Sequence, residues 1–317
     1  MKQKILRCIN FIVILVIILI ILSYIVIPKK NLEKFGMENQ TANGILGEKE
    51  NTIDVLIVGN SESYTSVVPL KIWGDYGYTT YICGTSGQTL PDSCMFVYKA
   101  MQKQNPKIVI LEADNLFDRE KLSKPFTKVI EEMVPIIKYH NRWKKLNKED
   151  FFQNVEYNWS DDFKGYNYTT TANEAEDKNY VSTSKSDKVN KMPKSNQLYV
   201  KMLNEYCKRN NAQLIIVSTP STVNWTHKNH NGIKRFAERE NIEFLDLNML
   251  NDEIQIDWEK DTRDKGDHLN HHGAVKVTEY MGKYLKSKNI LEDHRQDERY
   301  SKWNEIYNNY KGKYEQK

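Results

Sequence analysis

The sequence is poor in the residues that build metal centres and disulfide frameworks. Only four of its 317 residues are cysteines, and no CxxC pair or His/Cys cluster of metal-ligand spacing occurs. Cys8 stands at the start of a long apolar run, which leaves Cys83, Cys94 and Cys207 for the rest of the chain. We therefore expect buried free thiols and no metal, with a single Cys83–Cys94 bridge as the alternative.

A strong excess of charge of one sign is also missing. The chain has 46 Lys and Arg against 42 Asp and Glu, a formal net charge of +4. It has no zinc-finger spacing, RNP-like aromatic run or basic stripe, so we expect no nucleic-acid partner. Glycine (14) and proline (8) are few beside 19 tyrosines, a composition typical of an ordered globular chain.

One long hydrophobic run is present near the N-terminus. Residues Cys8 to Ile27 form about twenty uncharged residues, enough to cross a bilayer as a helix. Ile27 continues into Pro28 and two lysines with no small-residue cleavage site, so we predict an uncleaved signal anchor. It would give the chain a membrane lipid partner.

The orientation of this anchor is less sharply encoded. Basic residues flank both ends of the span, at Lys2, Lys4, Arg7 and at Lys29, Lys30, Lys34. Because a short tail before a first span usually stays inside, we expect a single-pass protein of the cell membrane whose soluble domain faces outward. Residues 1–30 are then tail and anchor, and the polar residues 31–52 are a juxtamembrane linker.

From residue 53 to 290, short apolar runs alternate with longer amphipathic stretches. The runs predict five strands: Ile53–Val58, Thr79–Cys83, Lys107–Leu111, Gln213–Ser218 and Glu243–Leu247. Helices are expected near 62–74, 91–104, 194–210, 229–240 and 271–288. The alternation predicts an α/β fold, a flavodoxin-like three-layer α/β/α arrangement with a mostly parallel five-stranded sheet. Ligands of such sheets gather at the carboxyl ends of the strands.

Two regions depart from the alternation. Residues 116–192 are interpreted as an insertion beside the active edge of the sheet. Residues 291–317 form a polar tail in which Trp303, Ile306, Tyr307 and Tyr310 recur at helical spacing. We expect this stripe to pack on the body of the protein.

Candidate catalytic residues stand near both ends of the α/β region. Ser61 directly follows the first strand, where its hydroxyl and the N–H groups of the next helix would face the active edge. The alternative is that Ser61 merely caps that helix. Late in the chain, His268 lies in a loop with Asp264 and Asp267, the arrangement that a general base and its orienting carboxylate require. His271 and His272 also suggest a metal site, but no carboxylate or histidine partner at i, i+4 spacing accompanies them.

Taken together, these blocks resemble the SGNH/GDSL hydrolase superfamily. In that family a serine block follows the first strand and an Asp-x-x-His block precedes the last helix. Here Gly59-Asn60-Ser61 resembles the first block, with Asn60 where Asp is commoner. The stretch Gly84–Thr89 resembles the glycine block, which implies that the backbone N–H of Gly87 helps to hold an oxyanion. No cofactor is implied.

The sequence departs from the family pattern in two places. When the third block is aligned from the strand, Asp114 falls at the position where the family usually has the oxyanion asparagine. Only a shift of the alignment by one residue brings Asn115 to that position. An ionised Asp would repel an oxyanion, so either Asn115 serves or this donor is missing. The Asp-x-x-His spacing would require an aspartate at position 265, where this chain has a lysine. Asp264 is favoured if the loop bulges at Gly266, and Asp267 is the alternative.

The resemblance extends to membrane-anchored bacterial proteins that handle acyl groups on envelope polymers, as in teichoic-acid D-alanylation and exopolysaccharide O-acetylation. It implies a serine esterase or O-acyltransferase acting on an acyl ester or carbohydrate, with a possible polytopic membrane O-acyltransferase as partner. Trp225 and His230, after the fourth strand, are candidate substrate-binding residues; the alternative is a packed loop. A non-catalytic scaffold or carbohydrate-binding subunit is the other hypothesis.

Overall fold

A parallel five-stranded sheet forms the centre of the protein. The computed structural model describes residues 2–119, 123–177 and 186–315. The strands lie in the order β2-β1-β3-β4-β5, and every neighbouring pair is parallel. They are β1 Val55–Gly59, β2 Thr80–Gly84, β3 Ile108–Glu112, β4 Gln213–Ser218 and β5 Glu243–Asp246. This is the flavodoxin-like order, and the predicted fold class is confirmed.

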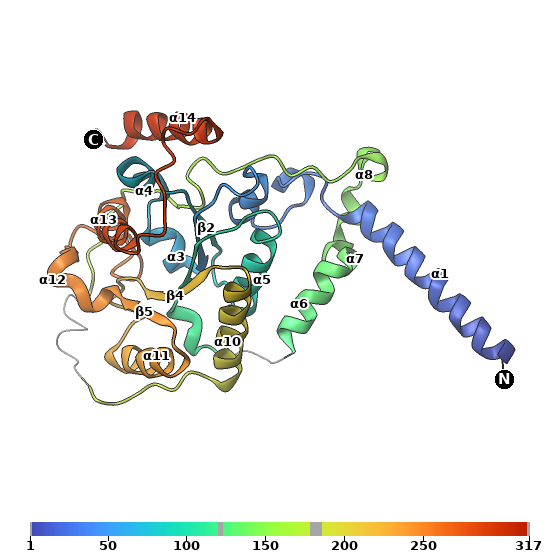
Figure 1. The fold of residues 1–317 in the computed structure, drawn as a ribbon, viewed down its shortest axis with the longest axis horizontal. Helices are drawn as coiled ribbons and strands as arrows, with labels where there is room; N and C mark the ends of the chain where they lie inside the picture. Colours follow the sequence, from blue (N-terminus) through green and yellow to red (C-terminus); the bar gives the residue numbers. More distant parts are fainter. Residues whose placement is uncertain (1, 120–122, 178–185, 316–317) are drawn as a thin grey trace.

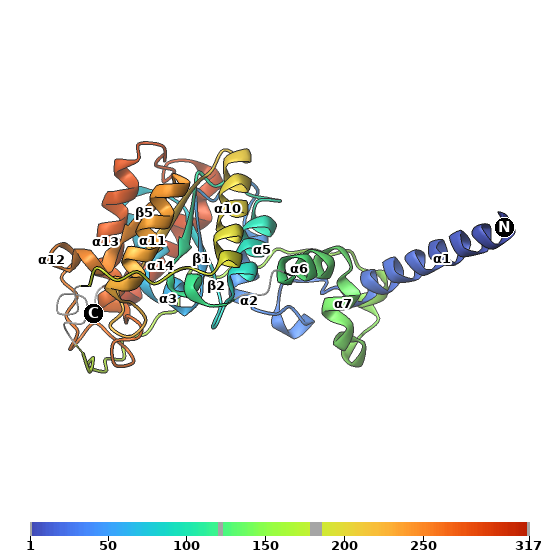
Figure 2. The same cartoon turned by 90° about the horizontal axis from the view of Figure 1, so that it is seen from below.

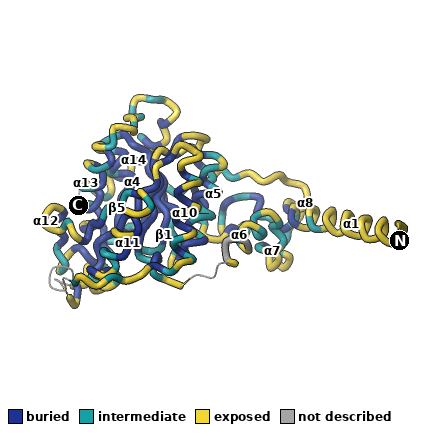
Figure 3. Tube along the Cα trace, turned by 60° about the horizontal axis from the view of Figure 1, so that its bottom comes forward, coloured by how far each residue is buried: buried dark blue, intermediate teal, exposed yellow. Residues whose placement is uncertain are grey.

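Helices cover both faces of the sheet (Figure 1). On one face α13 contacts α3 and α4, and on the other α10 contacts α5. Because both faces are covered, the central strands are mostly apolar, and all five residues of β1 and of β3 are buried (Figure 3). The covering helices are α3 Ser61–Ser66, α4 Pro69–Tyr76, α5 Leu90–Ala100, α10 Lys194–Arg209, α11 His227–Glu240 and α13 His271–Ser287.

The N-terminal helix α1, Lys2–Val26, projects away from this body (Figure 2). It is long and apolar enough to cross a membrane, and only 11% of its apolar window is buried. The segment 31–52, which we expected to be a linker, instead packs on the body. Ala42 and Ile45 are each 1% exposed, and the Tyr81 hydroxyl donates to the Thr41 carbonyl at 2.8 Å. Its short helices are η1 Glu33–Phe35, α2 Gln40–Asn43 and η2 Gly44–Gly47.

The insertion divides into two parts with different neighbours. Its first part, which we had expected beside the active edge, holds the short helices α6 Lys124–Met133, α7 Pro135–Tyr139, η4 His140–Lys145 and α8 Glu149–Phe152. Of these, α7, η4 and α8 contact α1, whereas α6 contacts α5 and α7. The second part returns to the predicted place, because Asn167 N donates to Tyr64 O at 2.8 Å and His271 N donates to Thr169 O at 2.7 Å. Residues 178–185 of the insertion lie outside the described residues.

The C-terminal tail closes over α4. Helix α14, Ser301–Tyr310, buries Trp303, Ile306 and Tyr310, as the helical spacing predicts. The Trp303 ring lies 5.4 Å from that of Trp73, centroid to centroid. The remaining short elements are η3 Asp114–Phe117, η5 Leu247–Leu250, α12 Asn251–Ile254, η6 Glu298–Tyr300 and the π-helical turn Lys311–Glu315. Cys83 and Cys94 are free thiols, so the alternative bridge is not formed.

Candidate active site

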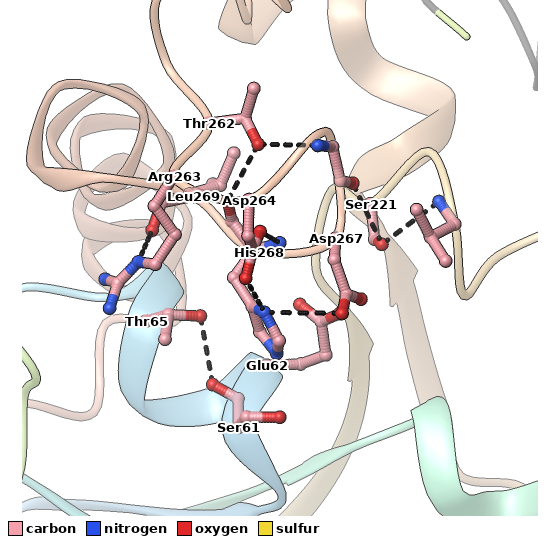
Figure 4. A network of polar contacts seen from close by, with 12 residues as sticks. Ser61, Glu62, Thr65, Ser221, Thr262, Arg263, Asp264, Asp267, His268 and Leu269 are labelled. Carbon is pink, nitrogen blue, oxygen red and sulfur yellow. Dashed lines mark hydrogen bonds and ion pairs between the residues drawn. The ribbon is translucent and has the colours of Figure 1, made fainter. Parts of the chain in front are cut away.

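Ser61 is the first residue of α3, directly after β1. The Asn60 side chain caps this helix by accepting a hydrogen bond from Glu62 N at 3.2 Å, so Asn60 and not Ser61 is the capping residue. The turn is tight: a Cβ at Gly59 would lie 2.5 Å from Glu112 Cβ, which explains a glycine at the end of the strand. The Ser61 side chain is therefore held at the carboxyl edge of the sheet without a capping role (Figure 4).

His268 is held by Asp264 at two points. Its Nδ1 lies 2.6 Å from Asp264 Oδ2, and its backbone N–H donates to Asp264 Oδ1 at 2.7 Å. Asp267 Oδ2 is farther from Nδ1, at 3.5 Å. Lys265 (φ +67°) and Gly266 (φ +96°) adopt left-handed backbone conformations, and this bulge brings the carboxylate four residues earlier back to the ring. The geometry thus favours Asp264 over Asp267 as the orienting acid.

The other ring nitrogen of His268 is unpaired. Nε2 is buried and has no hydrogen-bond partner among the described residues. In the tautomer whose Nδ1–H donates to Asp264, Nε2 carries the lone pair. Figure 4 shows the ring pointing toward the first turn of α3, which carries Ser61 and Glu62. No hydrogen bond joins Ser61 Oγ to Nε2 in the described part of the chain; such contacts are often long in empty sites and shorten in the substrate complex.

The sequence analysis missed the buried carboxyl of Glu62, directly after Ser61. Glu62 is 1% exposed, and Asn224 Nδ2 bridges it to Asp267 with distances of 2.8 and 2.5 Å. Burial, and then the neighbouring Glu112 and Asp114, raise the pKa of Glu62 well above its usual range. The protonated form of this carboxyl is therefore favoured relative to that of an exposed glutamate. A signal was available, since an acid one residue after the candidate nucleophile sits in the first turn of α3, against the sheet edge.

These acids also bear on metal binding. Glu62, Asp267 and His268 each offer one ligand atom within 4.8 Å of the others. The raised pKa of Glu62 works against metal binding, because a carboxyl must lose its proton to become a ligand. His271 packs between Tyr166 Oη at 3.1 Å and Tyr310 Oη at 3.3 Å, and burial lowers its pKa to about 4. Its role is structural.

The oxyanion side of Ser61 differs from the sequence expectation. Gly87 has φ +61° in an open loop after β2, where an added Cβ would meet nothing within 4 Å. Asn115 Nδ2 donates to Gln88 O at 2.6 Å, and Asp114 Oδ2 accepts from Asn60 Nδ2 at 2.5 Å. Asn115 therefore supports the Gly87 loop from beneath, and Asp114 fixes the Asn60 cap. Of the two alternatives for this block, the engaged Asn115 amide favours the one in which the oxyanion donor is missing.

The two candidate substrate-binding residues are packing residues. Trp225 is 2% exposed and donates through Nε1 to Asp246 Oδ2 at 2.9 Å. His230 Nδ1 lies 2.7 Å from the same oxygen. Asp246 ends β5 with 6% exposure and requires such partners once it is buried. The packed-loop alternative is therefore the better account, and Trp225 offers no surface to a substrate.

Two polar cavities border the Gly87 loop and share Thr85 and Ser86. One, of about 290 Å³, reaches Tyr64 and Asn167; the other, of about 280 Å³, reaches Lys138 of α7. A larger apolar cavity of about 520 Å³ lies between α5 and α10 and contains neither Ser61 nor His268. Neither polar cavity is lined by Ser61 or His268, but both border the loop after β2, and one reaches Tyr64 of α3. We place the candidate site beside them for that reason.

Comparisons with known proteins give fold-level likenesses. No protein-family model and no curated protein matches the chain. Among solved structures, it is similar to the psychrotrophic esterase EstA from Pseudoalteromonas sp., at 12% identity over 74% of this chain and 98% of that one, TM-score 0.41. A GDSL-like lipase from Bacteroides thetaiotaomicron (12%, 74% and 88%, TM-score 0.38) and a lipase/acylhydrolase from Enterococcus faecalis (9%, 74% and 97%, TM-score 0.39) are similar too. The chemistry of this chain rests on its own residues.

Proposed function

We propose that the chain is a membrane-anchored serine acyl esterase or O-acyltransferase of the SGNH/GDSL type, acting on cell-envelope carbohydrate polymers. One observation carries the proposal. His268 donates through Nδ1 to Asp264 at 2.6 Å and keeps a buried, unpaired Nε2 toward the turn that begins with Ser61. A neutral, oriented imidazole beside a serine at a helix start is the arrangement that activates a hydroxyl.

The reaction proceeds in two halves. His268 Nε2 accepts the proton of Ser61 as Oγ attacks an acyl carbonyl, and the backbone N–H groups of Ser61 and Gly87 stabilise the oxyanion. The ester C–O bond then breaks, and the leaving alcohol takes the proton from the imidazolium. A second hydroxyl, activated by Nε2, attacks the seryl ester and releases Ser61. Asp264 remains ionised throughout and stabilises the imidazolium.

Water or a carbohydrate hydroxyl can be the second acceptor. The polar cavities on both sides of the Gly87 loop support a carbohydrate, since they offer hydroxyl and amide groups and little apolar surface. Helix α1 supports a role at the membrane face, where nascent polymers would meet the site. In the outward orientation a polytopic membrane O-acyltransferase would be the partner that supplies acyl groups.

The test is turnover by the full chain in detergent or vesicles. Hydrolysis of a p-nitrophenyl acyl ester is followed with and without carbohydrate acceptors, in the wild type, Ser61→Ala and the control Ser287→Ala. Ser287 is exposed at the end of α13, outside both polar cavities, so it controls for non-specific acylation of a surface serine. Activity that Ser61→Ala abolishes and Ser287→Ala retains supports the proposal, and acyl-carbohydrate product identifies a transferase.

A non-catalytic scaffold is the second candidate. The missing Ser61–His268 hydrogen bond and the engaged amide of Asn115 favour it. In that case the folded chain binds carbohydrate with equal affinity in the wild type and Ser61→Ala, and neither hydrolyses any acyl ester.

A further inference from the structure

The C-terminal end of α1 is enclosed by the first part of the insertion. Along α1 the apolar side chains are exposed as far as Leu22, whereas Ser23 and Val26 are buried. The helices α7 and α8 and the turn η4 all contact α1. We name residues 133–155 the collar. Figure 2 shows these elements gathered at the base of α1, between it and the α/β body.

Polar contacts attach the collar to the last turn of α1. Ile136 N donates to Ser23 Oγ at 3.1 Å, and Tyr24 Oη donates to Gln153 O at 2.9 Å. The Arg142 guanidinium donates to the Val26 carbonyl and pairs with the buried carboxylate of Asp150 at 2.8 Å. These bonds satisfy the end of α1 and fix the orientation of the collar relative to it.

The outer surface of the collar is apolar and aromatic. Trp143 is 65% exposed, Phe151 46% and Phe152 84%, and Met133 is 77% exposed at its edge. Outside α1, every described tryptophan or phenylalanine that is largely exposed lies in this collar. Such clustering marks an interaction surface, because isolated exposed apolar residues are scattered in ordinary proteins.

Cations accompany these aromatics. Lys144, Lys145 and Lys148 are exposed, and Lys144 Nζ lies 5.8 Å from the centre of the Trp143 ring. Tryptophan is enriched at the boundary between headgroups and acyl chains, and lysine side chains near it meet anionic headgroups. The elements that carry these aromatics contact α1, whose own apolar side chains are exposed, and a membrane that α1 crosses would meet both.

We propose that the collar lies in the headgroup–acyl boundary of the bilayer that α1 crosses, with Trp143, Phe151 and Phe152 inserted and the lysines on anionic headgroups. This inference rests on the proposed membrane anchoring. It has a consequence for the active site, because α7 of the collar also lines the polar cavity that reaches Gly87. A collar fixed at the membrane surface holds the mouth of that cavity beside the bilayer.

The test is photocrosslinking of the full chain in vesicles of phosphatidylglycerol and phosphatidylethanolamine. The photoreactive residue p-benzoylphenylalanine replaces Phe152 or, as a matched control on the body, the 45%-exposed Ile290. Both positions are exposed, so neither replacement disturbs the core. The expected result is a phospholipid adduct, identified by mass, at position 152 and none at 290.

Alkaline extraction of the same vesicles separates this inference from the anchor. Protein that stays with the lipid but gives equal lipid adducts at 152 and 290, or adducts at 152 only with protein, overturns the collar and leaves the anchor standing. Protein that washes off overturns both. Replacing Trp143 and Phe151 by serine should lower the lipid adduct at 152 while the chain stays resistant to extraction.

Discussion

The surroundings of Ser61 differ between the side of the base, His268, and the side where an oxyanion would form. On the base side, the carboxylate of Asp264 contacts both the backbone N–H and the ring Nδ1 of His268. On the oxyanion side, the Asn115 amide is engaged with Gln88 O, and Asp114 places a carboxyl near the site. In the proposed function, Ser61 therefore has an oriented base, and the described residues offer backbone N–H groups to the oxyanion while the Asn115 amide is engaged elsewhere. Loss of one oxyanion donor typically costs about 10²–10³ in rate, so we expect a slow or specialised catalyst.

The largest effect should come from the base itself. Replacing His268 by Ala removes the only imidazole at the nucleophile, and ester hydrolysis should fall by roughly 10⁴–10⁶. Initial rates of p-nitrophenyl ester hydrolysis measure the loss. His272→Ala, a nearby histidine on α13, is the control and should keep most of the activity. Equal losses in the two variants would mean that the effect is on folding.

The next largest effect on kcat should distinguish Asp264 from Asp267. Asp264→Asn changes the group that fixes the His268 tautomer, and a loss of about 10²–10⁴ in kcat is expected. Asp267→Asn should cost far less, since Asp267 Oδ2 lies 3.5 Å from Nδ1 against 2.6 Å for Asp264. The same ester assay compares them. A larger loss for Asp267→Asn would reverse the assignment of the orienting acid.

Substitutions on the oxyanion side should have smaller effects. If Asn115 only supports the Gly87 loop, Asn115→Ala lowers kcat by less than the roughly 10²–10³ expected for a true oxyanion donor. Asp114→Asn removes a carboxyl that opposes negative charge and should leave kcat unchanged or raise it. Steady-state kcat and KM for both variants give the answer. A drop of about 10³ in Asn115→Ala would place its amide on the oxyanion after all.

The smallest expected effect is on stability and concerns the buried acids. Burial, and then Asp114, raise the pKa of Glu112 from 4.5 to about 8. Between these values the folded state holds a proton that the unfolded state releases. Stability from this group is therefore full below about pH 4.5 and is lost as the pH rises toward 8. In Glu112→Gln, the free energy of unfolding should fall less between pH 5 and pH 9 than in the wild type, as measured by denaturant unfolding at both pH values. An equal fall in the two proteins would show that Glu112 ionises normally.

The sequence predicted the sheet because buried parallel strands are continuous apolar runs, so the five strand positions follow from local composition alone. It also favoured Asp264, because a glycine at 266 permits the bulge that the structure contains. The raised pKa of Glu62 could not be foreseen. It depends on burial and then on Glu112 and Asp114, which lie at and just after the end of another strand.

Two outcomes have a common physical origin. The sequence left a substrate site and a packed loop as alternatives for Trp225, and the buried Asp246, which accepts the Trp225 N–H, favours the packed loop. Residues 31–52 were read as a linker from their polarity, yet their few apolar residues, such as Ile45, are completely packed. In both cases the deciding partner is distant in the sequence, and local pattern carries no information about it.

The most direct test of the central claim is covalent trapping. The full chain is treated with a fluorophosphonate, and the modified residue is located by peptide mass spectrometry in the wild type, Ser61→Ala and His268→Ala. The account predicts an adduct on Ser61 in the wild type and its loss or strong slowing in His268→Ala, where the serine is present without its base. An adduct elsewhere, or no adduct on the folded wild-type chain, would contradict the assignment of Ser61 as the nucleophile.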